Sequence, residues 1–161
     1  MGRKRNPVEP GEFVDPLSNY DPPRYADELE RVLCETEVSR MCITPVAWVD
    51  KSATVQDALD MMCKYDCSCV IIKEGDRAAG IFSARDVLNK VADDPATRAR
   101  PITDYMTPDP RTVYATDSPA KALNLMAVGG FRHIPVLDTD DKLIGVLGPR
   151  RTTEFLQEHL I

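Results

Sequence analysis

Two short motifs in this 161-residue chain place polar and charged side chains where they could bind a ligand. In the first, Ser83 and Asp86 follow a run of apolar residues, at the point where a helix is expected to begin. An aspartate offers two oxygens that accept hydrogen bonds from a diol, and the free N–H groups of a helix start favour a phosphate. The same Ser-x-x-Asp spacing is close to a capping box, which would hold the helix without any ligand. The two roles are compatible, so the motif by itself leaves both open.

The second motif is Arg132-His133, directly before a predicted strand. Arginine suits a phosphate because its planar guanidinium donates hydrogen bonds in pairs. Histidine adds a further donor, and a positive charge below neutral pH. The alternative is a pair of solvated polar residues, or a histidine that is satisfied within the core. We favour anion binding, because a planar donor beside a cleft fits the recognition of a phosphate.

A repeat of 64 residues organises the part of the chain that carries these motifs. In one predicted helix the apolar residues occur at i, i+3, i+4, i+7 and i+8, which places them on one face, and the pattern returns 64 residues later. Thr54 and Ser118 precede the two helices and are expected to cap them, because a hydroxyl can accept a free N–H of the first turn. The two faces comprise Val55, Ala58, Leu59, Met62 and Cys63 in the first helix and Pro119, Ala122, Leu123, Met126 and Ala127 in the second.

Short apolar runs separated by turn residues predict two strands after each of these helices. They cover residues 69–72 and 79–82 in the first repeat and residues 133–136 and 144–147 in the second. The order of elements in each repeat is therefore strand, helix, strand, strand, helix.

The last helix of each repeat is expected to start at Ser83 and at Gly148. The apolar residues that these helices should bury are Val87, Leu88 and Val91 in the first and Phe155 and Leu156 in the second. A unit of about 60 residues buries little surface alone. The sequence therefore predicts a mixed α/β (α+β) fold in which two repeats pack about a pseudo-twofold axis, with clefts between them.

The charge of the chain limits its partners. It has 20 Lys and Arg against 26 Asp and Glu, a net charge of −6, which argues against a general nucleic-acid binder because phosphate neutralisation needs a basic face. The one basic run, Arg3-Lys4-Arg5, is too short to change this expectation. Neither a secretory signal nor a membrane-spanning apolar run is apparent, so we expect a cytoplasmic protein with no membrane partner.

The five cysteines are expected to be reduced, since their number is odd and no export signal is apparent. Cys63, Cys67 and Cys69 form a cluster that could be a metal or redox site. The alternative is that they are small apolar residues of a helix end and a strand. No metal site is predicted, because the sequence does not supply the four ligands of a structural zinc site.

The first part of the chain lies outside the repeat. Five prolines within the first 23 residues predict an extended arm. A helix is expected after Pro23, with Tyr25, Leu29, Val32 and Leu33 on one face. This face could dock on the core of the protein or on a second copy of it. The expected organisation is an arm and helix over residues 1–37, a first repeat over 38–95 and a second repeat over 100–161.

Three segments in register with this repeat resemble a known family. They are Gly80-Ile81-Phe82-Ser83-Ala84-Arg85-Asp86, Asp104-Tyr105-Met106-Thr107-Pro108 and Phe131-Arg132-His133-Ile134-Pro135-Val136. Together with the order of the elements they resemble a tandem pair of CBS domains (cystathionine-β-synthase domains, the Bateman module). The resemblance covers roughly residues 38–158 and implies two β-α-β-β-α repeats. It also implies the binding of adenine nucleotides, such as AMP, ADP, ATP or S-adenosylmethionine, in the clefts between the repeats.

The resemblance assigns roles to residues of both repeats. Asp86 would accept hydrogen bonds from both ribose hydroxyls, and Ser83 would lie near the ribose or phosphate. Arg132 and His133 would bind the phosphate of the nucleotide whose ribose the first repeat holds. The adenine pocket would be formed by Pro110, Arg111 and Thr112, with Ile81 on the opposite side.

The two repeats differ at these positions, and the difference predicts one competent site. Gly148 and Arg151 stand where the first repeat has Ser83 and Asp86, and Ser68 and Cys69 stand where the second has Arg132 and His133. One cleft therefore keeps both halves of the motif and the other has lost both. In the family, a pair with arginine at this aspartate position can bring the preceding basic residue to the phosphate, a role that would fall to Arg150. The alternative is that Arg150 and Arg151 are solvated residues of a helix start.

The resemblance implies a stand-alone regulatory module that binds an adenine nucleotide in one cleft and signals to a partner protein in trans or through its own homodimer. No other cofactor is expected. The alternative is a structural or protein-interaction module with no ligand. No enzyme is predicted, because only His133 and His159 are present and no nucleophile or metal ligands accompany them.

Overall fold

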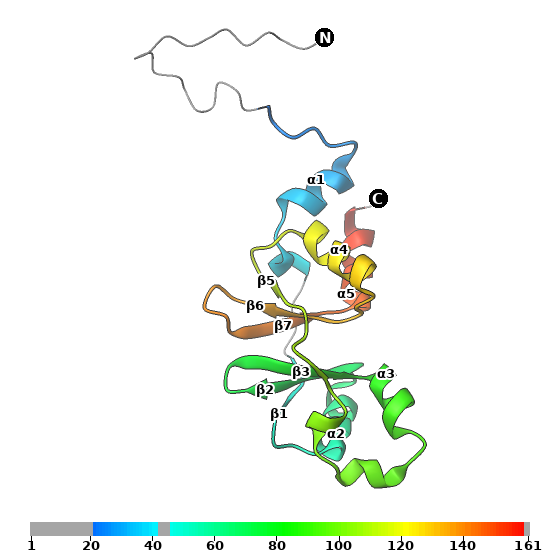
Figure 1. Ribbon diagram of the computed structural model, residues 1–161. Helices are drawn as coiled ribbons and strands as arrows, with labels where there is room; N and C mark the ends of the chain where they lie inside the picture. The colour runs from blue at the N-terminus through cyan, green and yellow to red at the C-terminus, as the bar shows by residue number, and fades with distance from the viewer. Residues whose placement is uncertain (1–20, 42–45, 160–161) are drawn as a thin grey trace.

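Two small β-sheets with helices on their outer sides make up the part of the chain, residues 21–41 and 46–159, that the computed structural model describes (Figure 1). The first repeat comprises β1 (Trp48–Asp50), α2 (Val55–Tyr65), β2 (Cys69–Glu74), β3 (Arg77–Ser83) and α3 (Ala84–Asp86). The second comprises β5 (Val113–Tyr114), α4 (Pro119–Gly129), β6 (Ile134–Leu137), β7 (Leu143–Leu147) and α5 (Pro149–His159). The predicted fold class and the order of elements are confirmed.

The helix caps follow from the residues that precede each helix. The Thr54 hydroxyl accepts a hydrogen bond from the Asp57 N–H (3.2 Å), and the Asp57 carboxylate accepts one from the Thr54 N–H (2.8 Å). Ser118 caps α4 by accepting from the Lys121 N–H at 3.3 Å. On the predicted apolar faces of α2 and α4 the first two residues are buried, the next two are half-buried, and the last ones, Cys63 and Ala127, are exposed.

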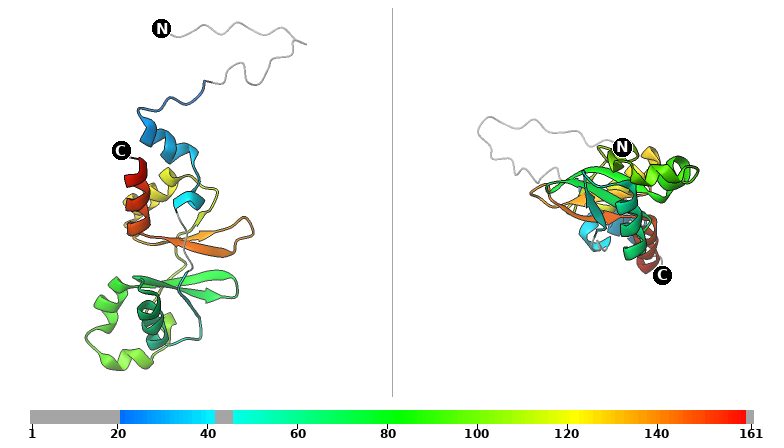
Figure 2. Two further views of the ribbon diagram at one scale, coloured as in Figure 1. Left: turned by 180° about the vertical axis from the view of Figure 1, so that it is seen from behind. Right: turned by 90° about the horizontal axis from the view of Figure 1, so that it is seen from below.

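The two sheets have the orders β1-β2-β3-β4 and β5-β6-β7, where β4 is the short strand Thr107–Pro108. In each, the first strand runs parallel to the second and the second antiparallel to the third. The β2–β3 and β6–β7 hairpins lie side by side in the middle of the molecule, with the helices outside (Figure 2). Successive side chains of a strand point to opposite faces of the sheet. Val70 and Ile72 pack in the core of the first repeat, so Ile71, which is fully buried, points to the other face, toward the second sheet.

The first residues of each repeat pack into the hydrophobic core of the other repeat. Val38 and Met41, in the 3-10 helix Val38–Met41, pack into the core beneath α4 and α5, whereas Ile102 packs into the core beneath α2. The backbone repeats this exchange, because the Val38 N–H donates to Asp117 O (2.8 Å) and the Ile102 N–H donates to Ala53 O (2.9 Å). Donors and acceptors of the two bonds are both related by the 64-residue repeat. The packing units therefore differ from the sequence repeats.

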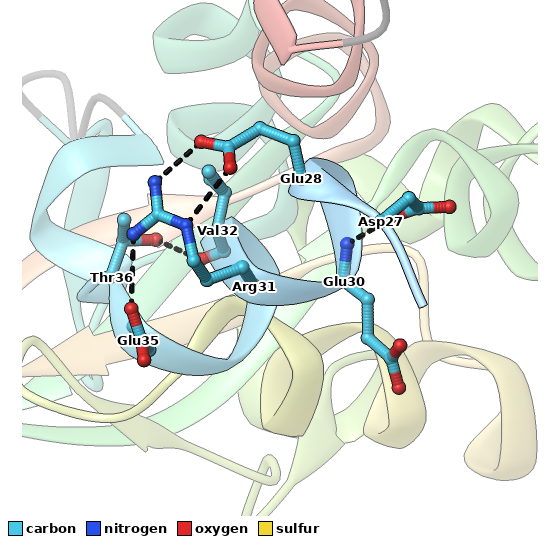
Figure 3. Close-up of polar contacts among 7 residues, drawn as sticks. All are labelled: Asp27, Glu28, Glu30, Arg31, Val32, Glu35 and Thr36. Carbon is cyan, nitrogen blue, oxygen red and sulfur yellow. Dashed lines mark hydrogen bonds and ion pairs between the residues drawn. The ribbon is translucent and has the colours of Figure 1, made fainter. Parts of the chain in front are cut away.

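The helix before the first repeat, α1 (Glu28–Glu35), packs against α4 and α5 and buries Val32 in the core of the second repeat. Of the two docking sites considered for it, the structure shows the chain's own core. Figure 3 shows its exposed face, where Arg31 donates to the carboxylates of Glu28 and Glu35. The predicted proline-rich arm and the Arg3-Lys4-Arg5 run lie outside the described residues. Across residues 21–41 and 46–159, no helix is long and apolar enough to cross a membrane.

The helix that follows β3 is α-helical for three residues only and continues as the π-helix η2 (Val87–Val91). Its closing bond runs from the Ala92 N–H to Val87 O, five residues back (2.9 Å). A π-helix has more residues per turn than an α-helix, so the faces predicted from the α-helical period shift. Val91 is buried as expected, but Leu88 is 70% exposed, and its predicted burial was wrong.

Candidate functional site

One cleft between the repeats contains five of the predicted site residues. This first cleft has a volume of about 290 Å³. The first repeat contributes Ile81, Ser83 and Asp86 from the end of β3 and the start of α3, and the second contributes Arg132 and His133 from the loop between α4 and β6. Residues that lie about 50 positions apart in the sequence are thus brought to one surface by the face-to-face packing of the two sheets.

The Asp86 carboxylate is held by three hydrogen bonds within the first repeat. Its Oδ2 accepts from the Ser83 N–H (3.0 Å) and from the Ser83 hydroxyl (2.8 Å), and its Oδ1 forms an ion pair with Lys90 Nζ (2.8 Å). Burial by itself would raise the pKa of Asp86, but the bonds from Lys90 and Ser83 outweigh it and the pKa lies below its ordinary value. Asp86 is therefore an anion at neutral pH, so both of its oxygens are acceptors that a diol could use.

The count of acceptor positions shows what this carboxylate can still bind. A carboxylate has about four acceptor positions, and three are occupied. A diol that contacts both oxygens needs one position on each. Oδ1 has one free acceptor position. Both positions of Oδ2 are occupied, and only the one that accepts from the Ser83 hydroxyl can be freed, by rotation of that hydroxyl, because the Ser83 N–H is fixed in the backbone of the helix start. A hydroxyl released in this way could itself contact the ligand.

His133 lies between the first cleft and a second one and lines both. Its Nε2 is 2.9 Å from the hydroxyl of Ser68, at the start of the opposite sheet. Its ring packs on Gly148, where a Cβ would lie only 3.2 Å from His133 Cδ2. Burial, and to a smaller extent Arg132, lower the pKa of His133, so the imidazole is neutral at pH 7 and acts through hydrogen bonds rather than charge.

The positive charge of the first cleft comes from two arginines. Arg132 and Arg85 both line it and are both exposed. Within the described part of the chain neither forms an ion pair, so both guanidiniums can turn to an anion in the cleft. Arg85 was not among the predicted site residues. Its place inside the Ser83–Asp86 motif, next to a helix start, is the signal that could have indicated it.

Other lining residues were also missed by sequence reasoning. Thr107 lies beside Ile81 on the same wall, because β4 pairs with β3 and Thr107 is the register partner of Ile81. Phe131 contributes an aromatic side chain, and its ring lies directly on Gly129, where a Cβ would be 2.1 Å from it. Thr107, Pro108 and Phe131 belong to the sequence segments that carry the family resemblance, and this is the signal that could have indicated a place for them in the cleft.

Arg150 lies elsewhere than the resemblance suggested. It lines the second cleft, of about 580 Å³, together with Arg151. Pro149 borders both clefts, and the next residue of α5 is turned by about 100° around the helix axis, which directs Arg150 away from Asp86. Its guanidinium pairs with Glu154 at 2.9 Å, and its side chain is 87% exposed. The structure therefore does not bring Arg150 to the first cleft.

The predicted adenine residues are not at the first cleft either. Pro110 and Thr112 line a groove of about 630 Å³ near the hairpin ends, and Arg111 is an exposed residue that lines neither the first nor the second cleft. The reason is the register of β4: the residues beside Ile81 are Thr107 and Pro108. After them the chain turns at Asp109, which has a φ of 45°, and leads away from the cleft.

Two of the clustered cysteines line the second cleft. The Cys67 thiol donates to Cys69 O at 3.2 Å. Burial raises the pKa of both thiols, that of Cys69 to about 12, so neither is a reactive thiolate at neutral pH. No group of three metal-binding side chains occurs within residues 21–41 and 46–159. The burial of Cys69 and the partial burial of Cys67 agree with the interpretation that these two are small apolar residues, whereas Cys63 is exposed.

Comparison with known proteins adds a family to this geometry. The family model of the CBS domain matches the chain twice, over residues 38–93 and 102–157. An uncharacterized 17.7 kDa protein of Acidianus ambivalens is 30% identical over 116 residues, which span 71% of this chain and 70% of that protein. Three further relatives are much longer, and the match spans only 14% to 19% of their length.

Solved structures share the fold. CBSX2, in complex with AMP, is 26% identical with a TM-score of 0.63, and the match covers 76% of this chain and 96% of that one. The CBS domain protein PAE2072 from Pyrobaculum aerophilum, complexed with AMP, is 22% identical with a TM-score of 0.66, and the match covers 76% of this chain and 99% of that one.

Proposed function

The chain belongs to the CBS-domain family, and on that premise we propose that it is a regulatory module that binds an adenine nucleotide in its first cleft. The observation that carries the proposal is the convergence of Ser83 and Asp86 from one repeat with Arg132 and His133 from the other in a single cleft. A diol acceptor on one side and two phosphate donors on the other match the two ends of a nucleotide. The AMP complexes of CBSX2 and PAE2072 support the ligand class.

The size and the charge of the cleft favour a small nucleotide. Its volume of about 290 Å³ lies just below the usual range for ligand pockets, about 300–1,000 Å³. Its cations are Arg85 and Arg132, since His133 is neutral and Arg150 lies in the second cleft. A monophosphate such as AMP fits this arrangement better than ATP, whose additional phosphates would extend beyond these two cations.

We further propose that the module regulates rather than catalyses. Its ligand would act by differential affinity, because it can shift the population of two conformations only by binding one of them better. A partner protein in trans or a second copy of the chain would respond to that shift. The expected state is a cytoplasmic homodimer, as the sequence reasoning suggested.

One observation favours a second candidate, a module that acts through protein contacts alone. Asp86 is already well satisfied without a ligand, because Ser83 and Lys90 occupy three of its acceptor positions. The motif would then serve to start a helix. On this alternative the two repeats and α1 would present a partner-binding surface, and nucleotides would leave the protein unchanged.

A thermal-unfolding screen separates the two candidates. The protein is melted with AMP, ADP, ATP, S-adenosylmethionine and adenosine, each at about 100 times the dissociation constant measured by calorimetry. A ligand at that concentration should stabilise the fold by about 2.7 kcal/mol. For a chain of this length that corresponds to a rise in Tm of about 5–10 °C. No shift and no binding heat with any of them would refute the nucleotide site and leave the protein-contact function.

A matched pair of variants tests whether the ligand binds at the first cleft. Asp86→Asn removes the anion that would accept the ribose and should abolish the shift. Asp117→Asn is the control, because Asp117 makes the equivalent i,i+4 ion pair with Lys121 and accepts the Tyr114 N–H, yet lines neither of the two clefts. Equal ligand shifts in the two variants would place the ligand elsewhere.

A further inference from the structure

Lys90 contacts the first cleft from behind. It does not line the cleft, and its side chain is 40% exposed, but its ammonium group makes two contacts at once. Lys90 Nζ pairs with Asp86 Oδ1 at 2.8 Å and donates to Tyr105 O at 2.7 Å. The first partner belongs to the wall that carries the diol acceptor. The second belongs to the segment that connects the two repeats.

The segment that contains Tyr105 leads into the neighbouring strand of the same wall. Two residues further on, Thr107 lines the cleft and pairs with Ile81 as the start of β4. Between them, Met106 packs so tightly on Gly80 that a Cβ there would lie 2.2 Å from its Sδ. A displacement of Tyr105 would therefore be passed to Thr107, because this short segment has little freedom against β3.

The backbone around Lys90 indicates that its position is specific. Lys90 lies in the π-helix Val87–Val91, which begins directly after Asp86. A π-helical turn is rare and is frequently found at functional sites. Here the insertion coincides with a lysine whose ammonium group reaches Asp86 and Tyr105 together.

We propose that Lys90 is a positioning residue of the nucleotide site, which clamps the Asp86 carboxylate to the Tyr105 carbonyl and so fixes the position of Asp86 relative to Thr107 on this wall of the cleft. The inference rests on the proposed function, since this relative position matters only if a nucleoside contacts both residues. Lys90 leaves one acceptor position of Oδ1 open and holds the carboxylate in one orientation. It acts on the ligand through Asp86 and Thr107 and does not touch it.

The test compares Lys90→Met with Lys90→Arg in calorimetric titrations of adenosine and AMP. Methionine keeps the apolar stem and removes the charge, whereas arginine keeps donors for both partners. Lys121→Met is the matched control, because Lys121 forms the same i,i+4 ion pair with Asp117 at 2.7 Å, away from the first and second clefts. Adenosine is included because it has no phosphate that a lysine could attract directly.

We expect Lys90→Met to lower the affinities for adenosine and AMP by the same factor, about five- to tenfold. This is the effect of losing one hydrogen bond to a charged group in a partly exposed site. Lys90→Arg should stay within about threefold of the wild type, and Lys121→Met should not change either affinity. Unchanged binding by Lys90→Met would overturn the inference. So would a loss confined to AMP, because Lys90 would then be a phosphate ligand, and so would an equal loss in Lys121→Met.

A measurement without ligand keeps this inference distinct from the proposed function. NMR titration of the Asp86 carboxyl should show a higher pKa in Lys90→Met than in the wild type, with no change in Lys121→Met. The Asp109 N–H, which donates to Ala79 O beside the Thr107 wall (3.2 Å), should exchange faster in Lys90→Met. If the wild type binds no nucleoside, the proposed function fails, yet an unchanged Asp86 titration would still refute the clamp separately.

Discussion

Replacement of Ile102 by alanine tests the exchange of core residues between the repeats. Ile102 lies at the start of the second sequence repeat, yet it is fully buried beneath α2 in the first core. Its N–H donates to Ala53 O at 2.9 Å, which anchors the backbone there. We therefore expect Ile102→Ala to destabilise the first repeat, although its place in the sequence suggests the second.

The size of the effect follows from the burial. The change removes three carbons from a fully buried side chain, worth about 0.8 kcal/mol each, and leaves a cavity that adds to the cost. We expect a loss of about 3 kcal/mol in the free energy of unfolding, within the range of about 2–5 kcal/mol found for such substitutions. For a chain of this length the Tm should fall by about 6–12 °C.

The assay combines thermal unfolding with native-state hydrogen exchange. Protection of the amides of β2 and α2 should fall most in Ile102→Ala, and those of β6 should keep more of theirs. Val38→Ala is the symmetric control, because Val38 is fully buried in the second core and its N–H donates to Asp117 O at 2.8 Å. It should show the opposite pattern. A Tm change below about 2 °C, or loss of protection mainly in β6 for Ile102→Ala, would refute this account of the core.

Three further predictions concern the clefts. Gly148→Ala places a Cβ 3.2 Å from His133 Cδ2, so it should lower the affinity for AMP severalfold in calorimetry while the Tm stays nearly constant. An unchanged affinity would contradict the role of His133. Burial holds the pKa of His133 below 6.5, so the unfolded chain takes up the proton at a higher pH than the folded one. The free energy of unfolding should therefore fall as the pH drops below about 6.5. His133→Gln should lose this dependence when the free energy of unfolding is measured by urea titration. Alkylation followed by peptide mapping should label Cys34 and Cys63 before Cys69, which is buried with a pKa of about 12, and fast labelling of Cys69 would mean that the second cleft opens readily.

The sequence contained enough information to predict the site where local signals and the repeat agree. Thr54 and Ser118 cap their helices as expected, since a hydroxyl before an apolar helical face acts within one turn. The comparison of the repeats pointed to Asp86 together with Arg132, and the structure places both in one cleft. That step needed only the register of the repeat, which is visible in the sequence.

What could not be predicted depends on rotation and register in three dimensions. Whether Arg150 faces one cleft or the other is decided by a single step around α5, with Pro149 bordering both. The residues predicted for the adenine pocket lie away from the first cleft because Thr107, three positions before Pro110, is the residue that pairs with β3. The exposure of Leu88 follows from a π-helix, for which the sequence has no recognisable signal. Each of these is a tertiary effect that outweighs the local pattern.

The position of His133 gives the molecule a common wall between its two clefts. His133, Ser68 and Pro149 each line both, and the bond between Ser68 and His133 spans the boundary. A molecule that displaces His133 from one side changes the shape of the other side by the same movement. Ligand binding in the two clefts is then thermodynamically linked. If a ligand in one cleft changes the affinity of the other cleft by some factor, a ligand in that other cleft changes the affinity of the first by the same factor. A ligand in the second cleft would in this way alter how tightly the first cleft binds the nucleotide proposed for it.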